Sequence, residues 1–437
     1  MIRKRCLWLC MAVFFFSVVL APSSAPAKTE IQWWHAHTGF LGERVNDIVA
    51  KFNGSQADYE VKAVYKGSYP EALTAAIAAY RAKTQPHLLQ GQEIATQTLL
   101  SSGAVYPVYQ LMKDQGITID WADFLSVVFS YYSKDGNLYS MPFNSSTVIL
   151  YYNRSIFKKA GLDPSAPPKT YEEIEKAATA CVKAGATKIG FTTAWPSWAL
   201  VENAHAWHDQ PFADQNNGFK GLATQLKING AFGLKMMTML ARWQKEGIYT
   251  YSGRGSKGDQ PIINGEAAIG LASTALVGTL AKTAKFEWGT GRMPRMAGYP
   301  QGNSIIGGAS LWVMKGRKAE EYKGVAKFLE FLGKPEQQAW WHAATGYLPV
   351  SKAALKALPA DHFQRNPDMW TAFNQIMSGK TTDNSKGIRL GNFAAVRDNI
   401  EAEMENIVGG KKTPKQGLDD AVKKGGEILK EFASLYK

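Results

Sequence analysis

The stretch EIQWWHAHTGFLGERVNDIVAKFNGSQADYEVKAVYK, residues 30–66, contains a strand pattern, a helix pattern and a second strand pattern. Side chains of different character alternate over residues 30–36, which is the period of a β-strand. Apolar residues then share one side of a helix expected over 42–52. A β-branched and aromatic segment at 59–66 predicts another strand. This order predicts a βαβ unit with a parallel sheet.

The same two patterns recur along the rest of the chain. We expect strands at 87–93, 138–143, 147–152, 188–192, 269–272 and 304–314, and helices at 71–82, 94–101, 155–160, 171–184, 234–245 and 418–435. The alternation predicts an α/β fold. The length of 437 residues is too great for one hydrophobic core, so two lobes are expected. Because we find no long flexible linker, crossing strands should join the lobes, and the crevice between them is a natural ligand site.

The N-terminal 27 residues are predicted to be a signal peptide. Three basic residues at positions 3–5 precede an apolar run over 6–21, and Ala25-Pro26-Ala27 offers small residues at the cleavage positions. We place the cut after Ala27. The alternative, an uncleaved membrane anchor, would need about 20 apolar residues to span a bilayer. A secreted protein is therefore expected.

Charge and cysteine content narrow the function further. The formal net charge is +13, or +10 without the three basic residues of the expected signal peptide. Lys and Arg are interspersed with Asp and Glu, without a basic arm or an aromatic-basic stripe, so no nucleic-acid partner is expected. The charge is compatible with an anionic small ligand. Of the three cysteines, Cys181 alone lies outside the signal peptide, and it is expected to be a buried, inert thiol without a disulfide.

No motif predicts an enzyme, a cofactor or a metal site. The sequence lacks a P-loop, Cys-x-x-Cys, His-Glu-x-x-His and Gly-x-Ser-x-Gly. Gly253-x-Gly255-x-x-Gly258 matches a dinucleotide-binding pattern, but Pro261 and Asn264-Gly265 follow, so we expect a loop with no helix opening there. Two pairs of histidines, His35 with His37 and His205 with His208, could each share a face, but neither pair comes with a clustered third ligand. A secreted phosphodiesterase would need a metal or a nucleophile–base pair, and neither is found.

A set of short segments together resembles the sn-glycerol-3-phosphate-binding group of the extracellular solute-binding proteins, the class that includes maltose-binding protein. They are Trp34-His35, Tyr65-Lys66-Gly67-Ser68-Tyr69, Pro142 to Ser146, Leu150 to Asn153, Phe157 to Leu162, Asn216 to Phe219, Ile305 to Met314, Thr345 to Pro349 and Arg389 to Asn392. The resemblance implies a type II periplasmic binding protein fold, two α/β lobes that close over a ligand by a hinge. It implies crossing segments at 145–148 and 306–309. Lobe 1 would comprise 28–145 and 304–345, and lobe 2 would comprise 146–303 and 346–437.

The resemblance also implies a ligand site. Arg397 matches a phosphate-pairing arginine, whose planar fork of donors fits phosphate oxygens. Tyr69 and Glu93 match groups that face glycerol hydroxyls, and Trp195 and Trp198 match aromatics that pack against the glycerol C–H face. Neutral donors are expected from Ser146, Ser273, Tyr347 and the backbone N–H of Gly308. The alternatives are a surface salt bridge for Arg397, a loop carboxylate for Glu93, ordinary packing for the aromatic residues and simple capping for the serines.

The function implied by the resemblance is capture of sn-glycerol 3-phosphate, or of glycerophosphodiesters such as glycerophosphocholine, for an ABC importer. The partners would be a permease heterodimer and its ATPase, the location periplasmic and the protein a monomer without a cofactor. Gln92 stands where an aromatic residue is expected and His37 lies near the cleft entrance, so the choice between monoester and phosphodiester stays open. The alternative is a binding protein of the same fold for a neutral sugar or oligosaccharide, which requires Arg397 to lie outside the cleft.

Overall fold

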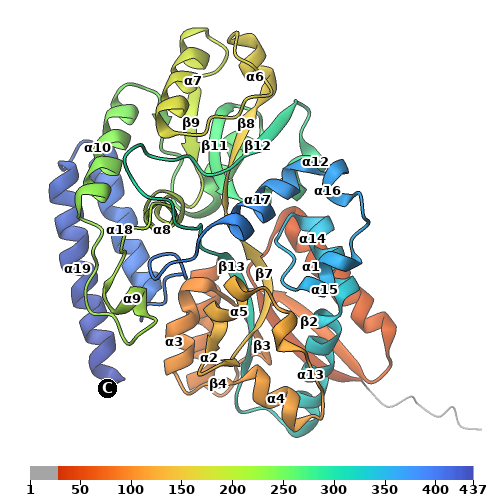
Figure 1. Ribbon diagram of the computed structural model, residues 1–437. Helices are drawn as coiled ribbons and strands as arrows, with labels where there is room; N and C mark the ends of the chain where they lie inside the picture. Colours follow the sequence, from red (N-terminus) through yellow and green to blue (C-terminus); the bar gives the residue numbers. More distant parts are fainter. Residues whose placement is uncertain (1–27, 437) are drawn as a thin grey trace, which may run out of the picture.

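The computed structural model describes residues 28–436, so the predicted signal peptide lies outside the described residues. The strands form two large sheets, one in each half of the molecule (Figure 1). The first has the order β2 (Tyr59–Tyr65), β1 (Thr29–His35), β3 (Leu88–Gln92), β13 (Gly307–Met314) and β4 (Val105–Tyr106), with β7 (Met141–Ser146) also paired to β13. The second has the order β10 (Tyr249–Thr250), β9 (Ile189–Thr193), β11 (Ala267–Ser273), β8 (Val148–Asn153) and β12 (Trp288–Gly291). A small hairpin joins β5 (Ser133–Lys134) and β6 (Asn137–Leu138).

Both sheets are mixed rather than parallel. Strand β1 runs parallel to β2 and β3, as residues 30–66 predict, and β9 runs parallel to β10 and β11. However, β13 is antiparallel to β3, β4 and β7, and β8 is antiparallel to β11 and β12. The prediction of a parallel sheet was therefore wrong for these strands. The single-residue connection between β7 and β8 sends the chain straight from one sheet into the other, without the helical crossover that a parallel neighbour needs.

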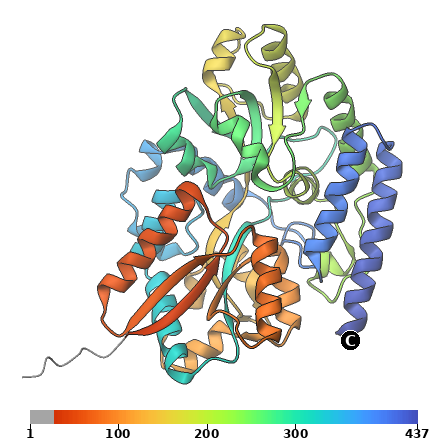
Figure 2. The same ribbon diagram turned by 180° about the vertical axis from the view of Figure 1, so that it is seen from behind.

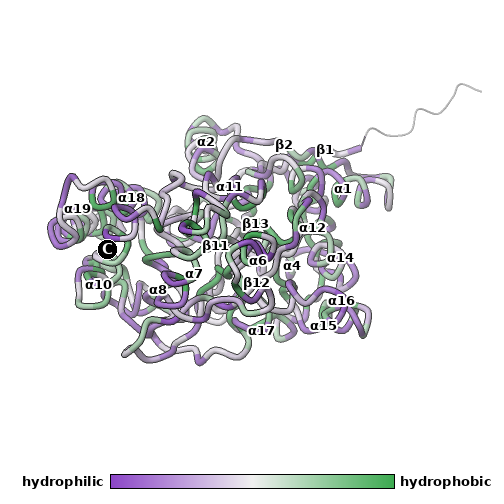
Figure 3. Tube along the Cα trace, turned by 90° about the horizontal axis from the view of Figure 1, so that it is seen from above, coloured by the Kyte–Doolittle hydropathy of each residue, from purple (hydrophilic) through white to green (hydrophobic). Residues whose placement is uncertain are grey.

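Helices cover the sheets. Around the first sheet lie α1 (Gly39–Ser55), α2 (Tyr69–Arg81), α3 (Thr96–Ser101), α4 (Val108–Asp114), α5 (Ser126–Tyr132), α13 (Ala319–Gly333), α14 (Pro335–Thr345) and α15 (Lys352–Ala357). The remaining helices are α6 (Arg154–Lys159), α7 (Tyr171–Lys183), α8 (Asn203–Trp207), α9 (Asp214–Gly218), α10 (Ala231–Lys245), α11 (Asp259–Ile263), α12 (Leu276–Thr283), α16 (His362–Arg365), α17 (Pro367–Ser378), α18 (Phe393–Val408) and α19 (Pro414–Leu435). Helices α10, α18 and α19 pack on one another at the edge of the molecule, where hydrophobic and hydrophilic residues alternate along them (Figure 3).

The chain passes between the two sheets at the segments expected to cross. Strand β7 ends at Ser146 and β8 begins at Val148, so Thr147 carries the chain from the first sheet to the second. Strand β13 begins at Gly307, which pairs with Ser146, and brings the chain back (Figure 2). The two crossing segments therefore lie side by side at the centre of the molecule. The exact lobe boundaries stay a prediction.

Burial agrees with a fully folded chain. Cys181 is a buried free thiol in α7, and burial raises the pKa of this thiol to about 11, which keeps it protonated and unreactive. Within residues 28–436, we find no helix that is both long and apolar enough to cross a membrane.

Candidate ligand-binding site

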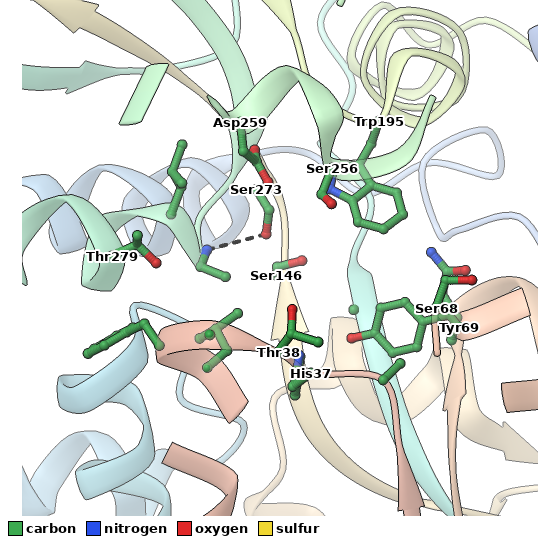
Figure 4. Close-up of a pocket in the computed structure, with 18 of the residues that line it drawn as sticks. His37, Thr38, Ser68, Tyr69, Ser146, Trp195, Ser256, Asp259, Ser273 and Thr279 are labelled. Atoms are coloured by element: carbon green, nitrogen blue, oxygen red, sulfur yellow. Dashed lines mark hydrogen bonds between the residues drawn. The ribbon is translucent and has the colours of Figure 1, made fainter. Parts of the chain in front are cut away.

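A cavity of about 480 Å³ lies between the two halves, beside the crossing segments. Its volume is in the range of small-molecule sites. Eight of the nine residues expected to bind ligand line it, namely Tyr69, Glu93, Ser146, Trp195, Trp198, Ser273, Gly308 and Tyr347. Figure 4 shows Ser146, Ser273, Trp195 and Tyr69 around this space. The ninth, Arg397, is not among the lining residues.

Three aromatic residues form one wall of the cavity. Tyr69 is the first residue of α2, which begins at a capping box between Ser68 and Glu71. The amide of Asn144 donates to the Tyr69 hydroxyl at 2.9 Å. The ring of His37 lies 6.0 Å from the ring of Tyr69 and 5.8 Å from that of Tyr347. Burial, reinforced by the nearby His35, lowers the pKa of His37 to about 3, so His37 is neutral near pH 7.

The crossing strands need glycine where they meet. Gly308 has a φ of +85°, and a Cβ at this position would lie 1.9 Å from the carbonyl oxygen of Asn144. A Cβ at Gly307 would lie 2.3 Å from the ring of Trp198. The absence of both side chains lets β13 approach β7 and leaves room for the Trp198 ring against Gly307. Ser146, opposite Gly307 on β7, is placed on the cavity by the same pairing.

The two tryptophans come from the segment that follows β9. Trp195 adopts the left-handed conformation with a φ of 51°, and its backbone N–H donates to the carbonyl of Gly255 at 2.7 Å. Trp198 opens a π-helical turn, η3 (Trp198–Glu202). Such turns are rare in proteins, and those that occur are often found at functional sites. The ring of Trp195 lies 6.5 Å from that of Tyr69, so aromatic residues from both halves face the cavity.

Arg397 is buried behind the cavity in an ion cluster. From α18, its Nε donates to Glu202 Oε1 at 2.8 Å, and its Nη2 donates to Glu202 Oε2 and to Glu93 Oε1, both at 2.6 Å. Glu202 is the last residue of the π-helical turn, whereas Glu93 begins η1 (Glu93–Ala95), directly after β3 of the first sheet. The cluster thus joins the two halves of the molecule. A surface salt bridge, the alternative for Arg397, does not describe this arrangement.

The pKa values follow from this burial. Burial raises the pKa of Glu93 to about 7, although the positive charge of Arg397 acts in the opposite direction. Burial likewise raises the pKa of Glu401, on α18, to about 7. Burial opposes the charge on Arg397, but attraction to Glu202 and Glu93 outweighs it and raises the pKa of Arg397 above its ordinary value. Arg397 is therefore charged, with two of its nitrogens engaged by protein carboxylates.

Sequence reasoning missed several residues of the cavity. Asp259, Ser256, Gln260 and Thr279 line it on the side of the second sheet, and Thr38, Ser68 and Glu71 on the side of the first. The segment around Gly253-x-Gly255-x-x-Gly258 is not simply a loop, because η4 (Gly255–Gly258) leads into α11 at Asp259. The expectation that no helix opens there was wrong, since Pro261 lies in the first turn, where proline is tolerated. The glycine spacing of residues 253–258 was the sequence feature that could have pointed to this part of the cavity. In the part of the chain that the structure describes, no group of three potential metal ligands occurs.

Comparison with known proteins agrees with this architecture. Residues 47–371 match the family model described as bacterial extracellular solute-binding protein. The chain is 44% identical over 421 residues to the sn-glycerol-3-phosphate-binding periplasmic protein UgpB of Yersinia pseudotuberculosis, covering 95% of each chain. It is 42% identical over 419 residues to UgpB of Salmonella typhimurium, covering 94% of this chain and 95% of the relative.

Solved structures of the same shape include UgpB from Mycobacterium tuberculosis in complex with glycerophosphocholine. That structure has a TM-score of 0.78 at 20% identity and covers 93% of this chain and 99% of its own. The maltose-bound MalE3 of T. maritima has a TM-score of 0.77 at 16% identity, with 92% and 100% covered. At these identities the likeness concerns the fold, which is that of type II periplasmic binding proteins. With the family model matching most of the chain, this protein belongs to the bacterial extracellular solute-binding proteins.

Proposed function

We propose that this protein is the periplasmic substrate-binding component of an ABC importer for glycerol phosphates. It captures sn-glycerol 3-phosphate or a glycerophosphodiester in the cavity and presents it to a permease heterodimer with its ATPase. It performs no chemistry on the ligand. The observation that carries the proposal is the cavity beside the crossing strands, combined with the full-length similarity to proteins named for binding sn-glycerol 3-phosphate.

The lining residues suit such a ligand. Serine and tyrosine hydroxyls and the backbone N–H of Gly308 supply neutral donors for phosphate oxygens, and Trp195 and Trp198 supply apolar area for the C–H face of glycerol. Glu93 Oε2 is buried and has no hydrogen-bond partner within residues 28–436. A ligand hydroxyl that donates to this oxygen would satisfy it, which supports Glu93 as the acceptor for the glycerol end.

Arg397 acts on phosphate only after a rearrangement. In this conformation Nε and Nη2 are bound to carboxylates, and Nη1 makes no hydrogen bond within the described residues. Closure that moves the two halves would change the distance between Glu93 and Arg397, because they belong to different halves. We propose that Arg397 then exchanges Glu93 for a phosphate oxygen.

A neutral sugar is the second candidate ligand, and Arg397 is the observation that favours it. No Lys or Arg belongs to the lining of the cavity, and the charge of Arg397 is already compensated by protein carboxylates. Aromatic side chains and carboxylates are also the groups that bind sugar rings and hydroxyls. The fold is shared with maltose-binding structures, so fold alone does not decide between the candidates.

Tryptophan fluorescence decides between the two. The purified protein is titrated separately with sn-glycerol 3-phosphate, glycerophosphocholine, inorganic phosphate and maltose. We expect a saturable change with a glycerol phosphate and none with maltose. Trp195→Phe should remove most of this change, whereas Trp370→Phe, at an exposed position on α17, should retain it. A response to maltose alone would replace the proposed ligand with a sugar.

A further inference from the structure

The cavity has an acidic lining. Three carboxylates line it, Glu71, Glu93 and Asp259, and none of the lining residues is Lys or Arg. Glu71 accepts from the backbone N–H of Ser68 at 2.6 Å, in the capping box of α2. Glu93 is paired with Arg397. His37 is neutral near pH 7 and adds no positive charge. Asp259 is therefore the lining carboxylate without a partner of its own.

Asp259 is held in place by backbone packing. It is the first residue of α11, and the preceding Gly258 packs so tightly under β9 that a Cβ there would lie 2.0 Å from the carbonyl oxygen of Thr193. The Oδ1 atom of Asp259 is buried and has no hydrogen-bond partner within residues 28–436. Burial alone raises the pKa of Asp259 to about 7, without a contribution from any neighbouring cation.

The position of Asp259 relates it to the phosphate end of the ligand. Asp259, Ser273 and Ser146 all line the cavity, and in the view of Figure 4 Asp259 is drawn above Ser273 and Ser146 below it. These two serines are the donors proposed for phosphate. A carboxylate at this place repels a bare phosphate monoester, and an unpaired buried carboxyl is costly. Both penalties fall if the phosphate carries a second ester substituent with a positive charge.

We propose that Asp259 is a specificity-determining residue that selects glycerophosphodiesters whose second substituent is an ammonium group. The inference rests on the proposed function and names a class within it. The ammonium lies against the Asp259 carboxylate, while the phosphate keeps its serine donors. Trp195 borders the same turn, since a Cβ at Gly255 would lie 3.8 Å from its ring, and an aromatic face also attracts a cation.

Isothermal titration calorimetry with three ligands tests the proposal. They are sn-glycerol 3-phosphate, glycerophosphoethanolamine and glycerophosphoglycerol, whose second substituents are absent, cationic and neutral. We expect the wild-type protein to bind the ethanolamine diester about tenfold more tightly than the glycerol diester, as for one charge pair of about 1.4 kcal/mol. Asp259→Asn should bring this ratio close to one and leave binding of sn-glycerol 3-phosphate unchanged or stronger.

The control is Glu43→Gln, which changes a carboxylate that is 68% exposed and does not line the cavity, and it should preserve the ratio. Retained binding of sn-glycerol 3-phosphate shows that each variant is folded. Equal affinity of the wild-type protein for the two diesters would overturn the inference, as would an Asp259→Asn variant that weakens all three ligands equally. If no glycerol phosphate binds to the wild-type protein and maltose does, the proposed function itself has failed, which is a different result.

Discussion

At the scale of single residues, Arg397 lies in a buried ion cluster with two carboxylates. Its side chain is 8% exposed, and its partners Glu93 and Glu202 are 4% and 1% exposed. Burying these groups costs several kcal/mol per ion, and their mutual attraction repays that cost only while all of them are present. The ion cluster therefore stabilises the fold next to the cavity, and it also supplies charged groups that a ligand can engage.

Arg397→Met is expected to destabilise the protein by about 3–5 kcal/mol at pH 7.5, because it leaves Glu93 and Glu202 buried without a cation. The urea midpoint of unfolding measures this loss. The deficit should shrink at pH 5, where Glu93, with a pKa near 7, is protonated and needs no cation. Arg254→Met is the control, since Arg254 and Glu405 are 38% and 37% exposed and such a pair contributes about 0–1 kcal/mol. Equal losses in the two variants would contradict the account.

The family resemblance named eight residues that line the cavity, but it did not give the ion pairs of Arg397. Four of the eight lining residues, Tyr69, Ser146, Gly308 and Tyr347, lie in the quoted segments that resemble a known family, and the other four were named by position from the same resemblance. The partners of Arg397 could not be named in this way, because Glu202 and Glu93 are 195 and 304 residues away from it in the chain. Asp259 was missed for another reason. Its burial is produced by the packing of Gly258 under β9, which no local pattern records.

At the scale of elements, the junction of β7 and β13 depends on backbone approach. Gly308 combines a positive φ with contact to the backbone of Asn144, so a side chain there is opposed both by its own conformation and by its neighbour. The junction lies between the two sheets and borders the cavity. Its geometry therefore affects stability and the position of Ser146 together.

Gly308→Ala should destabilise the protein more than Gly298→Ala. Gly298 has nearly the same φ, +86°, but no atom lies within 4 Å of its added Cβ. The Gly298→Ala control therefore loses only the free energy of placing an alanine in the left-handed conformation, about 1–2 kcal/mol. Gly308→Ala loses about 1–3 kcal/mol more, because its Cβ overpacks against Asn144. Chemical denaturation of both variants measures the difference. The same loss in both would show that the contact with Asn144 is relieved without cost.

Secondary structure could be predicted where the hydrophobic period of a strand or of a helix dominates a segment. Strands β1 and β2 and helices α7 and α19 lie where the patterns place them, because each buries one face against the core. Strand direction was not predictable in the same way. The antiparallel positions of β8 and β13 follow from the crossing of the chain between sheets, which is a property of the topology and not of any residue period.

At the scale of the whole molecule, stability should depend on pH through opposed sets of buried groups. All seven histidines have lowered pKa values, chiefly through burial, for example to about 3 for His37 and about 4 for His208. Below pH 6.5 the unfolded chain binds protons that the folded chain refuses, so stability falls as the pH falls. Glu93, Asp259 and Glu401 act in the opposite direction. Their folded pKa values near 7 contribute stability that is complete below about pH 4 and is lost as the pH rises through 7.

Seven histidines outnumber these three carboxyls together with Asp368, whose pKa burial also raises, so the free energy of unfolding should decrease on acidification from pH 6.5 to 4.5. Urea midpoints at half-unit steps of pH measure the slope, with the protein free of ligand. Asp259→Asn removes one opposing carboxyl, so the loss of stability in this variant should be steeper over the same window. Lys424→Met, which breaks an exposed ion pair with Glu427, should leave the slope unchanged. A protein that gains stability between pH 6.5 and 4.5 would mean that the histidines take up protons in the folded state, and the burial argument for His37 at the cavity wall would fail with it.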